Sequence, residues 1–344
     1  MPPPADTRKV LRRAIPAACV IFAAASALVF AAGPDAERRA LGPYPSLGAC
    51  HVFPRPAASV KPRARSLPTQ AAWNQNVSRA PVHPRSRAII AYINRHGDSF
   101  LHPDFGSPRA YGFPYRVVGR SQRRLPIRYT AYGSESDRGP FPIPPGAPVE
   151  GGRRSDGDRH VLVIDRSRCM LYELYRAFFR RSPRPHWNAD SGVSWNLRSP
   201  RLRRDGWTSA DAAGLPIFPG LVRYDEARSG RIRHAIRVTF ESTRDAWIHP
   251  ASHCAGDTRS PNAPAMGMRL RLRRGYSLKR FTGTARTIAV ALKRYGMIVA
   301  DNGSNWYFSG TSDRRWNDEN LNQLKRIPGR AFVVVKSRAR AHVC

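Results

Sequence analysis

The stretch RHVLVIDRSRCMLYELY, residues 159–175, decides the fold class that we predict for this chain. Two runs rich in Val, Leu, Ile and Tyr flank a short break at Arg166–Arg168, which is the pattern of a β-hairpin. Two further stretches, RIRHAIRVTF (residues 231–240) and MGMRLRLR (residues 266–273), alternate apolar and polar side chains with a period of two. We therefore expect several short strands, each with one face turned toward a core.

The alternation assigns each side chain to a face. In residues 231–240 the predicted core face holds Ile232, His234, Ile236, Val238 and Phe240, and the opposite face holds Arg231, Arg233, Arg237 and Thr239. In residues 266–273 the side chains of Met266, Met268, Leu270 and Leu272 are expected to point inward.

Helix patterns are few. Residues 83–97 predict a short helix with an apolar side and Gly97 as its stop, and residues 284–296 predict a second, capped by Thr284 and ended by Gly296. The following residues 297–310 predict a strand, a turn containing Asn-Gly, and a second strand. We predict a mainly β fold, a β-sandwich or jelly-roll-like single domain over residues 71–340 with a few short helices.

The N-terminus has the pattern of a secretory signal peptide over residues 1–32. Basic residues, Arg8 to Arg13, precede an apolar run that ends in small residues, with cleavage expected near Ala31 or Ala32. An uncleaved anchor is the alternative, because the run is nearly long enough to span a bilayer. Residues 33–70, rich in Pro and Arg, predict an extended leader. We expect a secreted or periplasmic protein, with no membrane span once the signal is cleaved.

Four cysteines lie beyond the predicted signal: Cys50, Cys169, Cys254 and Cys344. In an oxidising compartment this even number predicts up to two disulfides, in one of three pairings. Their wide spacing excludes a CxxC metal or redox motif.

The charge is strongly basic. The formal net charge is +34, and only six of the 58 basic residues are lysines. The arginines are spread along the chain, and no nucleic-acid-binding signature accompanies them, so no specific nucleic acid is predicted as a partner. Polysaccharides or other acidic polymers are the predicted partners.

The motifs HPDFG (residues 102–106), WTSADAAGLPI (207–217) and YGMIVADNGS (295–304) resemble those of an uncharacterised family of secreted bacterial proteins. The resemblance extends from about residue 50 to residue 335 and implies one continuous domain, but it brings no reaction with it. His253 follows the family pattern, whereas His249 stands where the relatives have tryptophan.

Three carboxylates are candidates for acid–base catalysis, because hydrolysis of a glycosidic bond needs a pair of such groups about 5–10 Å apart. Asp211 is one, although the preceding Thr208 and Ser209 also form a helix-capping pattern closed by Gly214. Asp301 is another, with the start of a hairpin turn as its competing role. Glu173 lies in the middle of a predicted strand, where it could face a groove.

Histidines supply further candidates. His234 is the one polar group on its predicted apolar face, so it is either a catalytic residue in a groove or a hydrogen-bonded core histidine. His249 and His253 have the i, i+4 spacing of some zinc sites, but Pro250 stands where a general-base glutamate would be needed. No metal site and no cofactor are predicted. We assign His253 to substrate binding, together with Arg237, Trp207 and Trp306.

Two classes of function remain open. The first is an exported glycoside hydrolase or polysaccharide lyase. The second is a non-catalytic envelope or extracellular protein that binds acidic glycans through tryptophans. Convergence of Asp211, Asp301 and a histidine in one groove would favour the enzyme, and a flat aromatic face would favour the binding protein.

Overall fold

The computed structural model describes residues 50, 72–105 and 112–344, and strands account for more of these residues than helices do. The mainly β class with a few short helices is therefore confirmed. The predicted signal peptide and nearly all of the leader lie outside the described residues. Among the described residues, no helix has the length and apolar character needed to cross a membrane.

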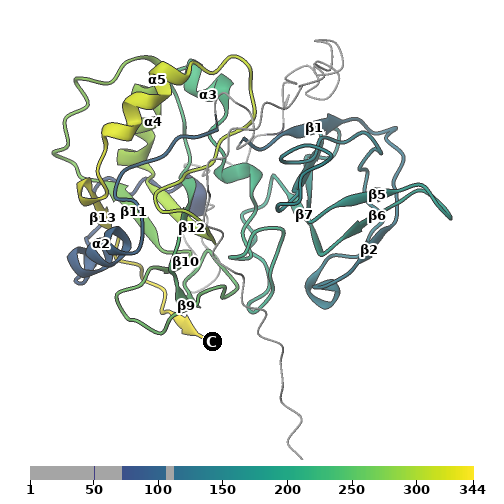
Figure 1. The fold of residues 1–344 in the computed structure, drawn as a ribbon, viewed down its shortest axis with the longest axis horizontal. Helices are drawn as coiled ribbons and strands as arrows, with labels where there is room; N and C mark the ends of the chain where they lie inside the picture. The colour runs from purple at the N-terminus through teal and green to yellow at the C-terminus, as the bar shows by residue number, and fades with distance from the viewer. Residues whose placement is uncertain (1–49, 51–71, 106–111) are drawn as a thin grey trace, which may run out of the picture.

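The elements form two halves, seen side by side in Figure 1. The β1–β7 half contains two sheets. One has the order β1 (Tyr115–Val118), β3 (Val161–Asp165), β4 (Met170–Tyr175) and β7 (Ser191–Asn196), and the other has the order β2 (Ile127–Tyr129), β6 (His186–Ala189) and β5 (Phe178–Arg180). The predicted hairpin of residues 159–175 is the antiparallel pair β3–β4.

The β8–β14 half also contains two sheets. One has the order β13 (Phe332–Val334), β11 (Arg269–Leu272), β12 (Met297–Asn302) and β8 (Ile236–Phe240), and the other has the order β10 (Ala265–Met266), β9 (Arg244–Trp247) and β14 (His342–Val343). The longer helices of this half are α2 (Ser86–Arg95) and α4 (Gly283–Arg294), and the shorter ones are α3 (Tyr224–Arg228) and α5 (Asp318–Asn322).

Short 3-10 turns complete the described chain. They are η1 (Ala72–Asn74), η3 (Gly133–Glu135), η4 (Phe218–Gly220), η5 (Gln323–Arg326) and η6 (Gly329–Ala331).

The sheet β1-β3-β4-β7 is buried on both faces. Val163 of β3 and Leu174 of β4 share one core cluster with Trp187 of β6, so the two sheets of this half pack on each other as in a small sandwich. On the other face, Leu171 of β4 packs against Phe218 in the segment that connects the two halves. This second cluster fixes the connecting segment, residues 198–222, against the sheet.

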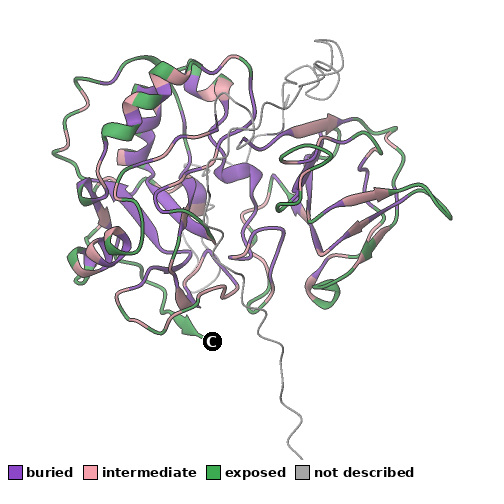
Figure 2. Cartoon of the chain, viewed as in Figure 1, coloured by how far each residue is buried: buried purple, intermediate pink, exposed green. Residues whose placement is uncertain are grey.

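The β8–β14 half has its own core. Ile236, Val238 and Phe240 of β8 lie in it, as the alternation predicted, and so do side chains from one face of α4. Figure 2 shows that face of α4 buried and the other exposed. Met266, Met268, Leu270 and Leu272 are buried as predicted.

Four local expectations are wrong. β8 begins at Ile236, so residues 231–235 precede the strand. Thr208–Gly214 form turns without a helix, so the capping interpretation fails there, and α4 has Thr282 rather than Thr284 as its N-cap residue. No hairpin crosses Asn302-Gly303, because β8 and β11 flank β12 and Phe308 instead bridges to Val238 of β8.

Two disulfides are present, as the cysteine count predicted. Cys50 pairs with Cys169 at the β3–β4 turn, and Cys254 pairs with Cys344, which follows β14 directly. The first ties a residue far upstream to the hairpin, and the second fixes the C-terminal strand to the loop after β9.

Candidate functional site

A cavity of about 160 Å³ receives side chains from both halves and from the connecting segment. We call it the acid cavity. The residues that matter for its chemistry are Tyr132, Asp158, His160, Tyr175, Asp211, His253 and Asp301. Its volume equals that of about five water molecules in the liquid, so it accommodates one small polar group or ring and not a whole polymer.

Three predicted site residues meet at the acid cavity: Asp211 and Asp301 line it, and Arg237 contacts both of them. Arg237 Nη2 donates to Asp211 Oδ1 at 2.6 Å and to Asp301 Oδ2 at 3.3 Å, and its Nε lies 3.4 Å from Asp211 Oδ2. Since both carboxylates contact one nitrogen, their oxygens cannot be farther apart than the sum of the first two distances. Asp211 and Arg237 are almost completely buried, whereas the Asp301 side chain keeps 22% exposure.

An irregularity in β12 explains how Asp301 reaches this position. Val299 lies opposite Val238 of β8, but Asp301 lies opposite the very next residue, Thr239, so one extra residue is inserted in β12. Such a bulge redirects a side chain within a sheet. Val299 stays in the hydrophobic core while Asp301 contacts Arg237, which lies on the face of β8 opposite to that of Val238.

Burial and mutual repulsion change the proton affinity of the pair. Burial, followed by the Asp211 charge, raises the pKa of Asp301 to about 7, although Arg237 opposes this. Burial also raises the pKa of Asp211, against the opposing effect of Arg237. Because Arg237 is closer to Asp211, we assign the anion to Asp211 and the shared proton to Asp301 near neutral pH.

A buried histidine fixes the loop that carries Asp211. His160, directly before β3, has Nδ1 at 2.5 Å from Glu150 Oε2 and Nε2 at 2.9 Å from the carbonyl oxygen of Ala210. Burial opposes protonation, but Glu150 outweighs it and raises the pKa of His160 to about 9. The imidazolium therefore donates two hydrogen bonds, one of them to the residue before Asp211.

His253 contributes a basic nitrogen to the same cavity. Its Nδ1 lies 3.0 Å from the carbonyl oxygen of Ala212, which can only accept, so Nδ1 carries the hydrogen. In the neutral ring this leaves the lone pair on Nε2. Tyr132, whose side chain is among the exposed aromatic groups, and Tyr175 lie at the same cavity, and burial raises the pKa of Tyr175 to about 12.

Glu173 is placed elsewhere. It accepts hydrogen bonds from the backbone N–H groups of Ile217 and Phe218 and from Trp195 Nε1, and it is completely buried. It does not line the acid cavity. Glu173 does lie on the face of β4 opposite to Tyr172 and Leu174, as the alternation predicted. That face packs against the connecting segment and does not border a groove.

The other predicted site residues are separated from the acid cavity. His234 is buried, with Nε2 at 3.1 Å from Glu226 and Nδ1 near the Ala235 carbonyl, the arrangement of a hydrogen-bonded core histidine. Trp306 is fully buried and donates to Asn94, so no face of its ring is open to a sugar. Trp207 lines a separate cleft, together with His249.

Among the described residues, the one group with metal-ligand spacing is Asp245, Cys254 and Cys344, and both of its sulfur atoms are joined in a disulfide. That group therefore offers no free thiolate.

No protein family, curated protein or solved structure matches this chain. The sequence reasoning missed His160, Tyr132 and Tyr175. His160 could have been noticed as the polar residue directly before the most apolar strand, but nothing in the sequence linked it to Ala210.

Proposed function

We propose that this protein is an exported enzyme that cleaves an extracellular polysaccharide, a glycoside hydrolase in which Asp301 is the proton donor. The observation that carries the proposal is the convergence of Asp301, Asp211 and His253 on one small cavity. A carboxyl group that keeps its proton near neutral pH, beside one that does not, is the arrangement that general acid catalysis requires.

Each group has a distinct task. Asp301 gives its proton to the glycosidic oxygen as the bond to the sugar breaks. His253 Nε2 accepts a proton from the attacking water. Asp211, held by Arg237, contributes the negative charge that raises the pKa of Asp301 and does not itself exchange protons. Tyr132 offers an exposed aromatic surface at the rim for a sugar ring.

Export is supported by two features. The N-terminal residues have the pattern of a signal peptide, and two disulfides tie the described chain. Both fit a protein that works outside the reducing cytoplasm.

A polysaccharide lyase is the second candidate, favoured by the fixed tautomer of His253. A base with a free nitrogen lone pair suits removal of the proton next to a uronate carboxylate. The two reactions leave different products, so one assay separates them. A non-catalytic glycan-binding protein is the remaining alternative.

The test is a screen of the purified protein against neutral and anionic polysaccharides. New reducing ends without ultraviolet absorbance indicate hydrolysis, and absorbance from unsaturated uronates indicates a lyase. On the polymer that is cleaved, we expect Asp301→Asn to lower kcat by about 10²–10⁴-fold, the usual contribution of a general acid. The exposed Asp156→Asn is the matched control and should leave kcat unchanged.

The dependence of activity on pH provides a second test. Activity that needs protonated Asp301 should fall as the pH rises through about 7. Measurable binding of a polysaccharide with no turnover of any tested polymer contradicts the enzyme and supports the binding protein.

A further inference from the structure

A second and larger cavity, of about 810 Å³, lies along residues 201–207. We call it the arginine cleft. Arg201, Arg203, Arg204 and Trp207 line it, and the connecting segment then continues directly into residues 208–212, which line the acid cavity. One continuous piece of chain therefore borders both cavities.

The carboxylates in the arginine cleft already have side-chain partners. Asp137 is paired with Arg203 at 2.9 Å, and Asp205 with His249 at 2.9 Å. Arg203 also donates to backbone carbonyl oxygens, including that of Thr208, and its side chain is nearly buried. Arg203 thus holds the wall of the cleft together.

Arg201 and Arg204 differ from Arg203. Both are exposed, and in the described part of the chain no hydrogen bond or ion pair engages either guanidinium group. Trp207 lies between the two kinds of arginine, with its ring centroid 5.4 Å from Cζ of Arg204 and 5.3 Å from Cζ of Arg203. A cation–π contact restricts the arginine side chain before any ligand arrives, which lowers the entropy lost on binding.

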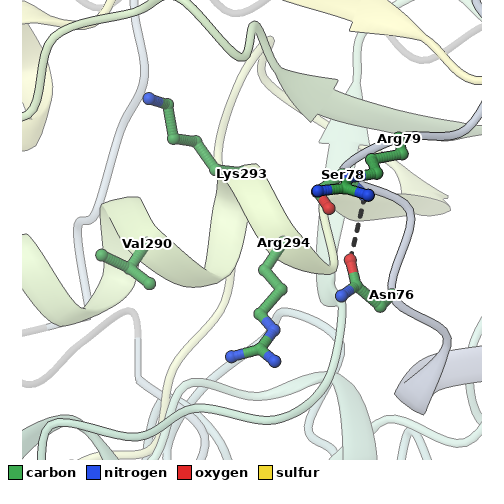
Figure 3. A pocket seen from close by; sticks show the side chains of 6 residues that line it. All are labelled: Asn76, Ser78, Arg79, Val290, Lys293 and Arg294. Carbon is green, nitrogen blue, oxygen red and sulfur yellow. Dashed lines mark hydrogen bonds between the residues drawn. The ribbon is translucent and has the colours of Figure 1, made fainter.

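Another basic cavity provides a comparison. Asn76, Ser78 and Arg79 line it from one side, and Val290, Lys293 and Arg294 from α4. Figure 3 shows Lys293 and Arg294 pointing away from each other, and no aromatic side chain lines this cavity. Its residues also border neither the acid cavity nor the connecting segment, so positive charge alone does not distinguish the arginine cleft.

We infer that the arginine cleft binds carboxylate groups along an acidic polysaccharide and guides that chain toward the acid cavity. Arg201 and Arg204 bind successive uronate carboxylates, and Trp207 is a positioning residue that holds Arg204 in place. The inference rests on the proposed function for the identity of the polymer, but binding can be measured without turnover.

The test compares binding of polygalacturonate, heparin and neutral dextran by the full protein with Asp301→Asn, so that no cleavage occurs. We expect Arg201→Ala with Arg204→Ala to raise the Kd for polygalacturonate by about tenfold or more, the loss of charge-assisted hydrogen bonds. The charge-matched control is Arg79→Ala with Arg181→Ala, two exposed arginines outside the cleft, which should change Kd by less than about threefold through long-range attraction alone. Trp207→Leu should weaken binding less than the double arginine variant.

Equal losses of affinity for polygalacturonate in the arginine variant and in its control overturn the inference, because binding then depends on overall charge. Tighter binding of single-stranded DNA than of polygalacturonate overturns the assignment to uronates, whereas heparin, which also carries uronates, should lose affinity in the arginine variant as polygalacturonate does. If the wild-type protein cleaves a polymer but the cleft variants keep its KM, the inference fails while the proposed function stands.

Discussion

Asp301 and Glu173 are carboxyl groups in two regions of the molecule, and burial raises the pKa of each to about 7. Their surroundings differ. Glu173 receives three N–H groups from Trp195 and the connecting segment and has no opening to solvent. Asp301 accepts one hydrogen bond from the backbone N–H of Asn302 and a longer one from Arg237, and its side chain is partly exposed at a cavity.

The comparison shows that a raised pKa reports burial and does not by itself identify a catalytic group. Glu173 joins β4 to the start of η4 and so fixes the connecting segment. Asp301 has the same altered proton affinity but also has room for a second reactant. Substitutions in the two regions should therefore have different effects on stability and on activity.

The largest effect on stability is expected at Arg237, because the Asp301 region depends on a buried cation. Arg237→Met leaves Asp211 without its ion-pair partner in a buried site, which costs about 3–5 kcal/mol of unfolding free energy. Urea denaturation measures this. Adding Asp211→Asn removes the uncompensated charge and should recover part of the loss; no recovery would show that Arg237 stabilises through packing alone.

A smaller effect is expected in the Glu173 region, which holds its carboxylate with N–H groups. Glu173→Ala leaves three buried donors unsatisfied and should cost about 2–4 kcal/mol. Glu173→Gln keeps one acceptor oxygen and should cost about half as much. With a cleavable polymer, both variants should keep the wild-type kcat per folded molecule; loss of kcat without unfolding would assign Glu173 a part in the reaction.

The smallest effect is the dependence of stability on pH, to which both regions contribute. The folded-state pKa values of Glu173 and Asp301 lie above their ordinary values of 4.5 and 3.8, and that of His160 lies above 6.5. The native state therefore holds these protons more tightly, and the stability they contribute is lost as the pH rises through about 7 and then about 9.

We expect each of these three groups to lower the unfolding free energy by on the order of 1–3 kcal/mol, between about pH 4 and 7 for the two carboxyl groups and between about pH 6.5 and 9 for His160. At acid pH the dependence of stability on pH has the opposite sign. Arg223 and His234 outweigh burial and lower the pKa of Glu226 to about 2, so the stability that Glu226 contributes is lost as the pH falls from 4.5 to 2. Urea denaturation across this range is the measurement. Glu173→Gln and Asp301→Asn should each flatten the decline below pH 7, and an unchanged slope in both would contradict the assigned protonation.

Short-range pattern was a good guide to the strands and to single candidates. The β3–β4 hairpin, the core face of β8 and the helix over residues 86–95 followed from apolar periodicity. Asp211, Asp301, Arg237 and His253 were selected for their chemistry, and they lie at or beside one cavity. His234 and Trp306 were selected by the same reasoning and are core residues.

The sequence by itself determined the mainly β class, the number of disulfides and the residue types available for acid–base chemistry, because these depend on local periodicity, residue counts and functional groups. Tertiary structure alone decided the disulfide pairing, the burial of Arg237 and the separation of Glu173 from Asp301. These depend on contacts between residues far apart in the chain. The extra residue in β12 turns Asp301 toward Arg237, and that shift arises only when β12 pairs with β8.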